Sequence, residues 1–230
     1  MALILCVETS SKNCSVSISD SGKVLFIKEE FDQNYCHGER LHVLIQDLVE
    51  SSTISLDNLD ALAFSAGPGS YTGLRIGAAT IKGLSVALEK KVILVSTLES
   101  MAWAFVNQIK KVRCNYFFPI LDSRVGEVYA AMYDVNLKSY LDPFACDVGS
   151  FPFLEYLKTN KICFFGPGIH KLSHFSDHKN ASFFKDIYPS SSYLSEIAQQ
   201  HFNNGYFVDV AYFEPFYLKP FISTSSRKNN

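Results

Sequence analysis

The sequence predicts an α/β protein made of two similar halves, because one run of patterns occurs twice. Each half opens with an apolar strand that ends at an acidic residue, followed by a serine-containing turn and an alternating strand. The segments "LCVETSSKNCSVSI" (5–18) and "PILDSRVGEVYAAMY" (119–133) carry this order, with Glu8 and Asp122 at the strand ends. Helical periodicity follows in the first half, so strands and helices alternate there.

The first half is predicted to run β-β-β-α-β-α-β. Its first strand is the apolar run 2–10, and residues 13–23 alternate up to an Asp-Ser-Gly turn that signals a hairpin. Apolar residues at i, i+3, i+4, i+7 and i+8 predict a helix with one buried face: Leu41, Leu44, Ile45, Leu48 and Val49. The other predicted elements are a return strand at 24–31, a strand reached through 56–66, a helix at 73–89 and a strand at 92–97.

The second half repeats the opening pattern and is less clear beyond it. Its predicted elements are a strand–turn–strand unit at 116–135, helices at 150–158 and 191–202, a strand and turn at 161–168 and a disordered polar tail at 223–230. Two α/β halves that each begin with a hairpin are typical of the actin-like ATPase (ribonuclease H-like) fold. We therefore expect an N-terminal lobe over 1–100 and a reduced C-terminal lobe over 101–222.

The composition indicates a globular protein without the basic surplus of an RNA-binding chain, although a local basic patch or a basic partner could still bind RNA. Hydrophobic residues make up 47% of the 230 residues, charged residues 19%, and the formal net charge is −2. A chain that bound RNA without a partner would carry an excess of basic residues, because these neutralise the phosphates. With no leader pattern and no apolar run near the ~20 residues of a membrane span, we expect a cytoplasmic protein without membrane contact.

The six cysteines form no CxxC pair, which argues against a zinc knuckle and a thioredoxin-type site. Cys6 lies in an apolar run and is expected to be a buried thiol.

The densest motif is "AFSAGPGSYTGLRIGAATIKG" (63–83). A P-loop is excluded, because Gly69 and Gly73 stand one residue too close and Leu74 replaces the lysine. The GxGxxxG spacing from Gly67 approaches the dinucleotide-binding pattern, but it follows the fourth strand and not the first. The glycines therefore need another explanation.

The helix after this loop has a defined start and small residues. We predict that Ser70 and Thr72 cap it, and that Arg75 in its first turn has a carboxylate or an anion as partner. Six small residues keep the helix thin: Gly77, Ala78, Ala79, Gly83, Ser85 and Ala87. Two interpretations stay open, close packing on the protein's own sheet and docking of a partner's helix.

Other clusters allow several chemistries. His170, His174 and His178 would share a helix face and could bind zinc, although the preceding Gly-Pro-Gly indicates a loop. Asp122 and Glu127 flank a turn and could act as acid–base groups. The segment "VETSSKNCS" could be a phosphate-binding hairpin or a capped structural turn, and no nucleophile elbow is present.

Three segments resemble the TsaB (YeaZ) family of bacterial tRNA threonylcarbamoyladenosine biosynthesis proteins. They are "GPGSYTGLRIGAATIKGLSVAL", "ILCVETSSKNCSVSI" before it and "DSRVGEVYAAMYD" after it. Near the C-terminus, "FEPFYLKPF" is similar to the closing motif of that family. The likeness covers about residues 3–135 and 210–220, with 136–209 matching only in outline. The family has the actin-like fold predicted above.

The resemblance implies a partner protein and not a catalyst. Members of this family pair with a paralogous enzyme, TsaD, which transfers a threonylcarbamoyl group to the adenosine beside the anticodon of tRNA. A small ATPase, TsaE, joins them. The chain would scaffold and activate TsaD, reach tRNA through the complex, and have no activity and no cofactor alone, with ATP or ADP at the complex interface.

The resemblance also assigns residues. The partner interface would lie on the first two helices, with His37, Arg40, Leu41, Leu44, Arg75, Ala78, Ala79, Lys82, Gly83 and Val86. Leu41 could instead be part of the core. A vestigial nucleotide loop would comprise Glu8, Thr9, Ser10, Ser15, Gly67, Gly69 and Ser70. The HxxxH metal pair of the partner enzyme is absent, since His37 and His42 stand five residues apart, so we expect no metal and no catalytic residue.

Two other functions stay open. A free-standing actin-fold ATPase or small-molecule kinase would need a metal-holding aspartate where this chain has Glu8, and an adenosine pocket in a small second half. A homodimer would form if the small-residue face of the helix predicted at 73–89, left without a partner protein, bound a second copy of the chain.

Overall fold

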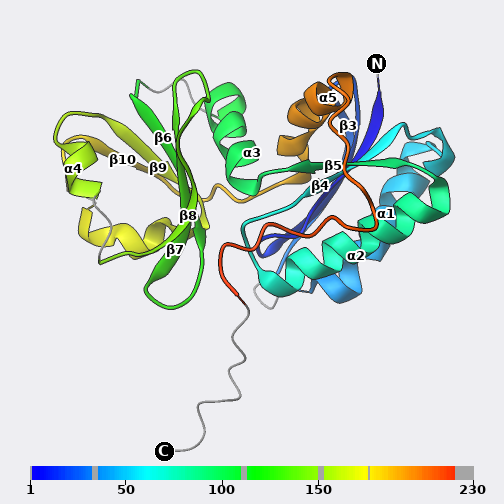
Figure 1. The fold of residues 1–230 in the computed structure, drawn as a ribbon, viewed down its shortest axis with the longest axis horizontal. Coiled ribbons are helices and arrows are strands. Elements are labelled where there is room, and N and C mark those ends of the chain that lie inside the picture. The colour runs from blue at the N-terminus through cyan, green and yellow to red at the C-terminus, as the bar shows by residue number, and fades with distance from the viewer. Residues whose placement is uncertain (1, 33–35, 110–112, 150–152, 176, 221–230) are drawn as a thin grey trace, which may run out of the picture.

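The computed structural model describes residues 2–32, 36–109, 113–149, 153–175 and 177–220, which form two five-stranded sheets side by side (Figure 1). The first sheet has the order β3-β2-β1-β4-β5. Its strands are β1 (Leu3–Glu8), β2 (Asn13–Asp20), β3 (Lys23–Phe31), β4 (Ala61–Ser65) and β5 (Lys91–Val95). β1 pairs antiparallel with β2 and parallel with β4, so it lies at the centre of the sheet.

The second sheet repeats this topology. Its strands are β6 (Tyr116–Asp122), β7 (Glu127–Asp134), β8 (Ser139–Asp147), β9 (Ile162–Phe165) and β10 (Ala181–Phe184), in the order β10-β9-β6-β7-β8. β6 pairs antiparallel with β7 and parallel with β9, as β1 does with β2 and β4. The predicted duplication is thus confirmed, and Glu8 and Asp122 are equivalent last residues of the two central strands.

Helices cover both faces of the first sheet. α1 (His37–Ser52) and α2 (Tyr71–Leu88) pack on one face around Leu41, Phe64 and Leu74. α5 (Ser195–Asn203) and the short η4 (Ser191–Leu194) pack on the opposite face, against Ile4, Ala63 and Ile93. A segment late in the sequence therefore completes the core of the first lobe, and periodicity along the chain does not reveal this packing. The predicted division into an N-terminal lobe over 1–100 and a C-terminal lobe over 101–222 stays a prediction.

Capping residues set the helix boundaries. α2 begins at Tyr71, two residues before the predicted start, because the Ser70 side chain accepts from the Gly73 N–H. The strand predicted at 92–97 ends at Val95, because Ser96 caps a further helix, α3 (Thr97–Ala104), which the sequence reading did not predict. The remaining helical segments are η1 (Leu56–Asn58), η2 (Phe105–Ile109), α4 (Phe153–Leu157) and η3 (Pro167–Phe175).

The chain returns to the first lobe after α5. Val208 N–H donates to the Val92 carbonyl, and Phe213 is buried in the core of the first sheet. Residues 213–220, called the strap below, then run past α2 toward the second sheet (Figure 1). Among the described helices, none is long and apolar enough to cross a membrane.

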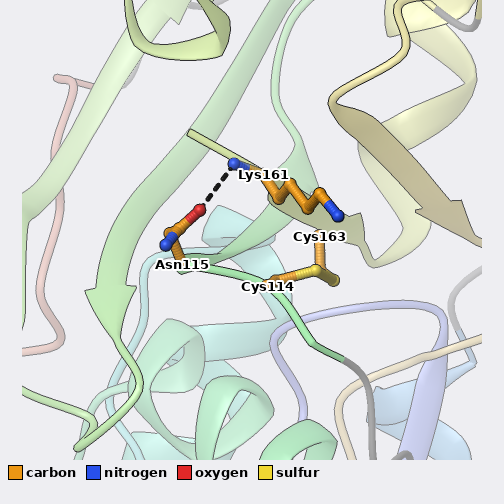
Figure 2. Close-up of a disulfide and its surroundings, with 4 residues drawn as sticks. All are labelled: Cys114, Asn115, Lys161 and Cys163. Carbon is orange, nitrogen blue, oxygen red and sulfur yellow. Dashed lines mark hydrogen bonds between the residues drawn. A yellow bond between two sulfur atoms is a disulfide. The ribbon is translucent and has the colours of Figure 1, made fainter. Parts of the chain in front are cut away.

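A disulfide between Cys114 and Cys163 ties the segment before β6 to β9 (Figure 2). Beside it, Asn115 Oδ1 accepts from the Lys161 N–H at 2.8 Å. Cys163 is buried among the aromatic residues of the second core. This disulfide is not predicted from the sequence, because the two cysteines lie 49 residues apart and meet only through strand pairing.

We expect reduction of this disulfide to destabilise the protein. Closing a loop of this length removes entropy from the unfolded chain, equivalent to roughly 4 kcal/mol. Urea unfolding with and without dithiothreitol measures the difference. The double variant Cys114→Ala, Cys163→Ala is the control, and its unfolding midpoint should not respond to reductant. Equal midpoints for the wild-type protein in both conditions would contradict the expectation.

Candidate functional site

The glycines of residues 63–83 serve close packing of α2 against the turn that follows β1. A Cβ at Gly69 would clash with the Ser10 carbonyl, and one at Gly73 with the Thr9 carbonyl. A Cβ at Gly77 would clash with the Thr9 hydroxyl and lie 2.5 Å from the Phe64 ring. Helix and turn therefore touch backbone to backbone, which a side chain at these positions would prevent.

Hydrogen bonds hold the same contact. Ser70 N–H donates to the Ser10 carbonyl at 2.7 Å, and the Thr9 hydroxyl donates to the Gly73 carbonyl at 2.8 Å. Gly67, at φ 109°, turns the chain into the helix. The start of α2 thus faces the protein's own chain at the place where a nucleotide loop would present its amides.

Glu8 is fully buried behind this turn. Its Oε1 accepts from the Ser10 N–H, whereas Oε2 has no hydrogen-bond partner among the described residues. Burial raises the pKa of Glu8 to about 7, against the opposing effect of hydrogen bonding to the carboxyl. The carboxyl is therefore largely protonated below neutral pH, unlike the ionised aspartate that holds a metal ion.

The Ser15 hydroxyl of the predicted loop is engaged by side chains of this chain. Ser15 Oγ lies 2.7 Å from Ser191 Oγ and donates to Glu29 at 2.8 Å. The same Glu29 oxygen accepts from Ser190 at 2.6 Å. Ser15 thus ties the first sheet to the segment leading into α5, which favours the structural-turn interpretation of this hairpin.

The predicted interface residues divide into buried and exposed ones. Four side chains lie inside the first lobe: His37, Leu41, Leu44 and Ala78. His37 Nε2 lies 2.7 Å from the Ser11 carbonyl, and burial lowers the pKa of this imidazole. A partner can therefore reach these helices only through the other residues.

Arg40 and Lys82 are half-buried and contact their own chain. Arg40 pairs with Glu30 at 2.7 Å. The Lys82 ammonium lies 4.6 Å from the centre of the Phe213 ring and donates to the Ala211 carbonyl. The carboxylate or anion expected beside Arg75 does not appear among the described residues; its guanidinium lies over the Tyr71 ring at 5.7 Å.

The exposed side of α1 and α2 carries small and apolar residues beside charged ones, among them Glu39, Asp47 and Arg75. We call it the α1–α2 face and define it by the exposed residues Val43, Ala79, Gly83 and Val86. Val86 is 73% exposed. Apart from the backbone of α2 itself, the described residues place no atom within 4 Å of a Cβ built on Gly83, so their packing does not require glycine there.

The acidic and histidine clusters predicted from the sequence make contacts within the chain. Asp122 pairs with Lys171 at 3.1 Å and Glu127 with Lys219 at 2.6 Å, so both carboxylates are neutralised by lysines. His170 Nδ1 lies 2.8 Å from the Pro167 carbonyl. The side chain of His174 lies outside the described residues, and within the described part of the chain no group of three His, Cys, Asp or Glu could hold a metal ion.

Comparison with known proteins places the chain among tRNA-modification proteins. A family model described as "TsaD: tRNA N6-adenosine threonylcarbamoyltransferase" matches residues 33–148, half of the chain. "tRNA threonylcarbamoyladenosine biosynthesis protein TsaB" of Haemophilus influenzae is 27% identical, over 94% of this chain and 93% of that protein. The Escherichia coli protein of the same name is 36% identical over 56% of this chain and 54% of its own length.

Solved structures agree with this placement. A protein from Pseudomonas aeruginosa, described as similar to peptidase YEAZ, superposes with a TM-score of 0.81 at 25% identity, covering 95% of this chain and all of that one. A Clostridium difficile activator of 2-hydroxyisocaproyl-CoA dehydratase superposes with a TM-score of 0.52 at 8% identity, over 89% of this chain and 96% of that one. These matches confirm the predicted actin-like fold.

The two kinds of glycine in α2 should respond oppositely to alanine. Gly77→Ala forces a methyl group into Thr9 and Phe64 and should cost roughly 2 kcal/mol. Gly83→Ala meets no atom and should stabilise the helix by about 0.5–1 kcal/mol. Urea unfolding of both variants provides the comparison, and a destabilised Gly83→Ala would show that Gly83 is needed within the chain.

The buried Glu8 carboxyl should make stability depend on pH. Its folded pKa of about 7 lies above the ordinary value of 4.5, so the folded state binds the proton more tightly than the unfolded state. Stability should therefore fall as pH rises from about 4.5 to about 7, and then level off. Glu8→Gln should remove this fall, which amounts to about 3 kcal/mol.

Denaturant unfolding of the wild-type protein and Glu8→Gln across this pH range measures the effect. Glu39→Gln, at an exposed glutamate of α1, is the matched control. Parallel pH profiles for wild-type protein and Glu8→Gln would mean that Glu8 is ionised in its buried position.

Proposed function

We propose that this chain, which belongs to the TsaB (YeaZ) family, is a non-catalytic partner subunit that scaffolds and activates TsaD in tRNA threonylcarbamoyladenosine biosynthesis. The α1–α2 face is the docking surface in this proposal. TsaE joins the complex, tRNA is bound through it, and ATP or ADP lies at the interface and not on this chain alone.

The observation that carries the proposal is the open position at Gly83. Gly69, Gly73 and Gly77 are each required by contacts within the chain, whereas Gly83 has free space around its Cα. A glycine on an exposed, apolar helix face lets a second helix approach closely. The family model described by the TsaD name matches residues 33–148, which include α1 and α2. A related chain could therefore present equivalent helices across a nearly two-fold interface.

A scaffold role also agrees with the chemistry of the turn after β1. Glu8 is buried with a raised pKa, and Ser70 N–H is bonded to the Ser10 carbonyl. Metal-dependent phosphoryl transfer needs an ionised carboxylate and free donors at this place. The ATPase or kinase alternative therefore has little support from this turn, whereas a homodimer through the α1–α2 face competes directly with the proposed heterodimer.

Charges placed on the α1–α2 face should abolish partner binding. In Ala79→Arg plus Gly83→Arg, two cations would be buried without partners, which should weaken the complex at least tenfold. Co-purification with TsaD of the same organism measures it. Ser182→Arg plus Asn204→Arg, at exposed positions on other elements, is the matched control and should leave the complex intact.

Circular dichroism establishes that each variant is folded. A wild-type protein that forms no complex with TsaD would overturn the proposal, and ATP binding and hydrolysis by this chain would then be measured. A complex that tolerates the two arginines would place the interface elsewhere.

A further inference from the structure

The disulfide between Cys114 and Cys163 joins a partly exposed sulfur to a buried one. Cys163 on β9 is fully buried among the aromatic side chains of the second core, whereas Cys114, just before β6, is partly exposed. A thiolate opens a disulfide by attacking one of its two sulfur atoms, and access decides which one. The sulfur of Cys114 therefore offers the line of attack, and that of Cys163 is the leaving group.

The other four cysteines of the chain are free thiols: Cys6, Cys14, Cys36 and Cys146. A small domain that depends on disulfides in an oxidising compartment pairs most of its cysteines. Where cellular thiols are kept reduced, a disulfide is usually transient and serves catalysis or redox sensing. A single disulfide beside four free thiols is typical of a bond that takes part in redox chemistry.

Two cations are neighbours of the disulfide along the chain. Arg113 directly precedes Cys114, Lys161 lies two residues before Cys163, and both basic residues are exposed. Positive charge beside a sulfur stabilises the thiolate that forms when the bond opens. Positive charge also attracts an anionic thiol such as glutathione to this end of the second sheet.

The strands beside the disulfide are also held together without it. The Asn115 N–H donates to the Lys161 carbonyl at 2.7 Å, and the Lys161 N–H donates back to Asn115 Oδ1 at 2.8 Å (Figure 2). From there the parallel pairing of β6 with β9 runs from Tyr116 to Pro119. Opening the disulfide therefore leaves this pairing in place, so the folded protein can close the bond again.

The chain that leads to Cys114 comes from the helix that connects the two lobes. α3 follows β5 of the first lobe, continues into the π-helical η2, and packs against β6 and β7 of the second lobe. Phe105 of η2 stacks on Phe165 with 4.2 Å between ring centres, and Phe165 lies two residues after Cys163 on β9. The redox state of the disulfide therefore sets whether the chain after this connecting helix is fastened to β9.

We propose that the Cys114–Cys163 disulfide is a thiol-exchange site, which glutathione or a related small thiol opens and closes in the folded protein. The first thiolate forms an S–S bond with Cys114, the Cys114–Cys163 bond breaks, and Cys163 leaves as a thiolate. A second thiolate attacks the sulfur of the bound glutathione, which releases Cys114 and oxidised glutathione. Each leaving thiolate takes up the proton that its attacking thiol had lost, so one disulfide and two thiols become two thiols and one disulfide.

Peptide mass spectrometry of the folded wild-type protein tests this inference, which does not depend on the proposed partner role. The protein is incubated with millimolar reduced glutathione without denaturant, and free thiols are then blocked by alkylation. We expect the disulfide to open and glutathione to be found on Cys114. A disulfide that opens only in urea would overturn the proposal, and so would glutathione on Cys163.

Two single variants give a matched comparison with oxidised glutathione. Cys163→Ser leaves the partly exposed Cys114 as a free thiol, and Cys114→Ser leaves the buried Cys163. The mixed disulfide should form about tenfold or more faster on Cys114 than on Cys163, because reaction requires access to the sulfur. Equal rates in two variants that circular dichroism shows to be folded would contradict the assigned site of attack.

Reversibility is the last measurement. Wild-type protein is brought to equilibrium in glutathione redox buffers, starting once from the oxidised and once from the reduced form. Both series should reach the same fraction of Cys114–Cys163 disulfide, with an unchanged circular dichroism spectrum. Loss of the folded spectrum on reduction, or failure of the reduced protein to re-form this pair, would show a purely structural cross-link and overturn the proposal.

Discussion

The backbone contact between α2 and the turn after β1 is the constraint on which the rest of the first lobe depends. Gly69, Gly73 and Gly77 allow the helix to lie directly on Thr9 and Ser10. Glu8 is fully buried behind that contact, which also occupies the Ser70 N–H before the helix. It also fixes the rotation of α2 about its axis, so Ala79, Gly83 and Val86 face outward. A feature that looks like a phosphate loop thus serves the packing of a helix on a turn of the same chain.

The two lobes share a topology but not a set of roles. The first sheet is covered on both faces, by α1 and α2 and by α5, and its central turn is closed. In the second lobe, Arg124 on the turn after β6 lines a pocket together with the start of α2 and the strap. The strap joins the two lobes with an aromatic contact at one end and an ion pair at the other.

Local sequence patterns predicted many of the strands and helices, whereas the other features of the fold depend on long-range contacts. Alternation and helical spacing located β1, β2 and α1 within a few residues, and the repeated strand–acid–turn order predicted the equivalent sheets. The positions of Cys163, α5 and Lys219 depend on pairings between segments far apart in the chain, which no spacing rule encodes. Helical periodicity also could not separate buried Ala78 from exposed Ala79, because a thin helix has small residues on every side.

The late return of the chain to the first sheet has a consequence for synthesis on the ribosome. Strands β1 to β5 are complete once Val95 has been made, yet one face of their sheet stays uncovered until Ile197 and Ala198 emerge. Phe213 reaches the other core later still. The nascent first lobe therefore exposes apolar surface while about 100 further residues are translated, a period in which that sheet is prone to aggregation.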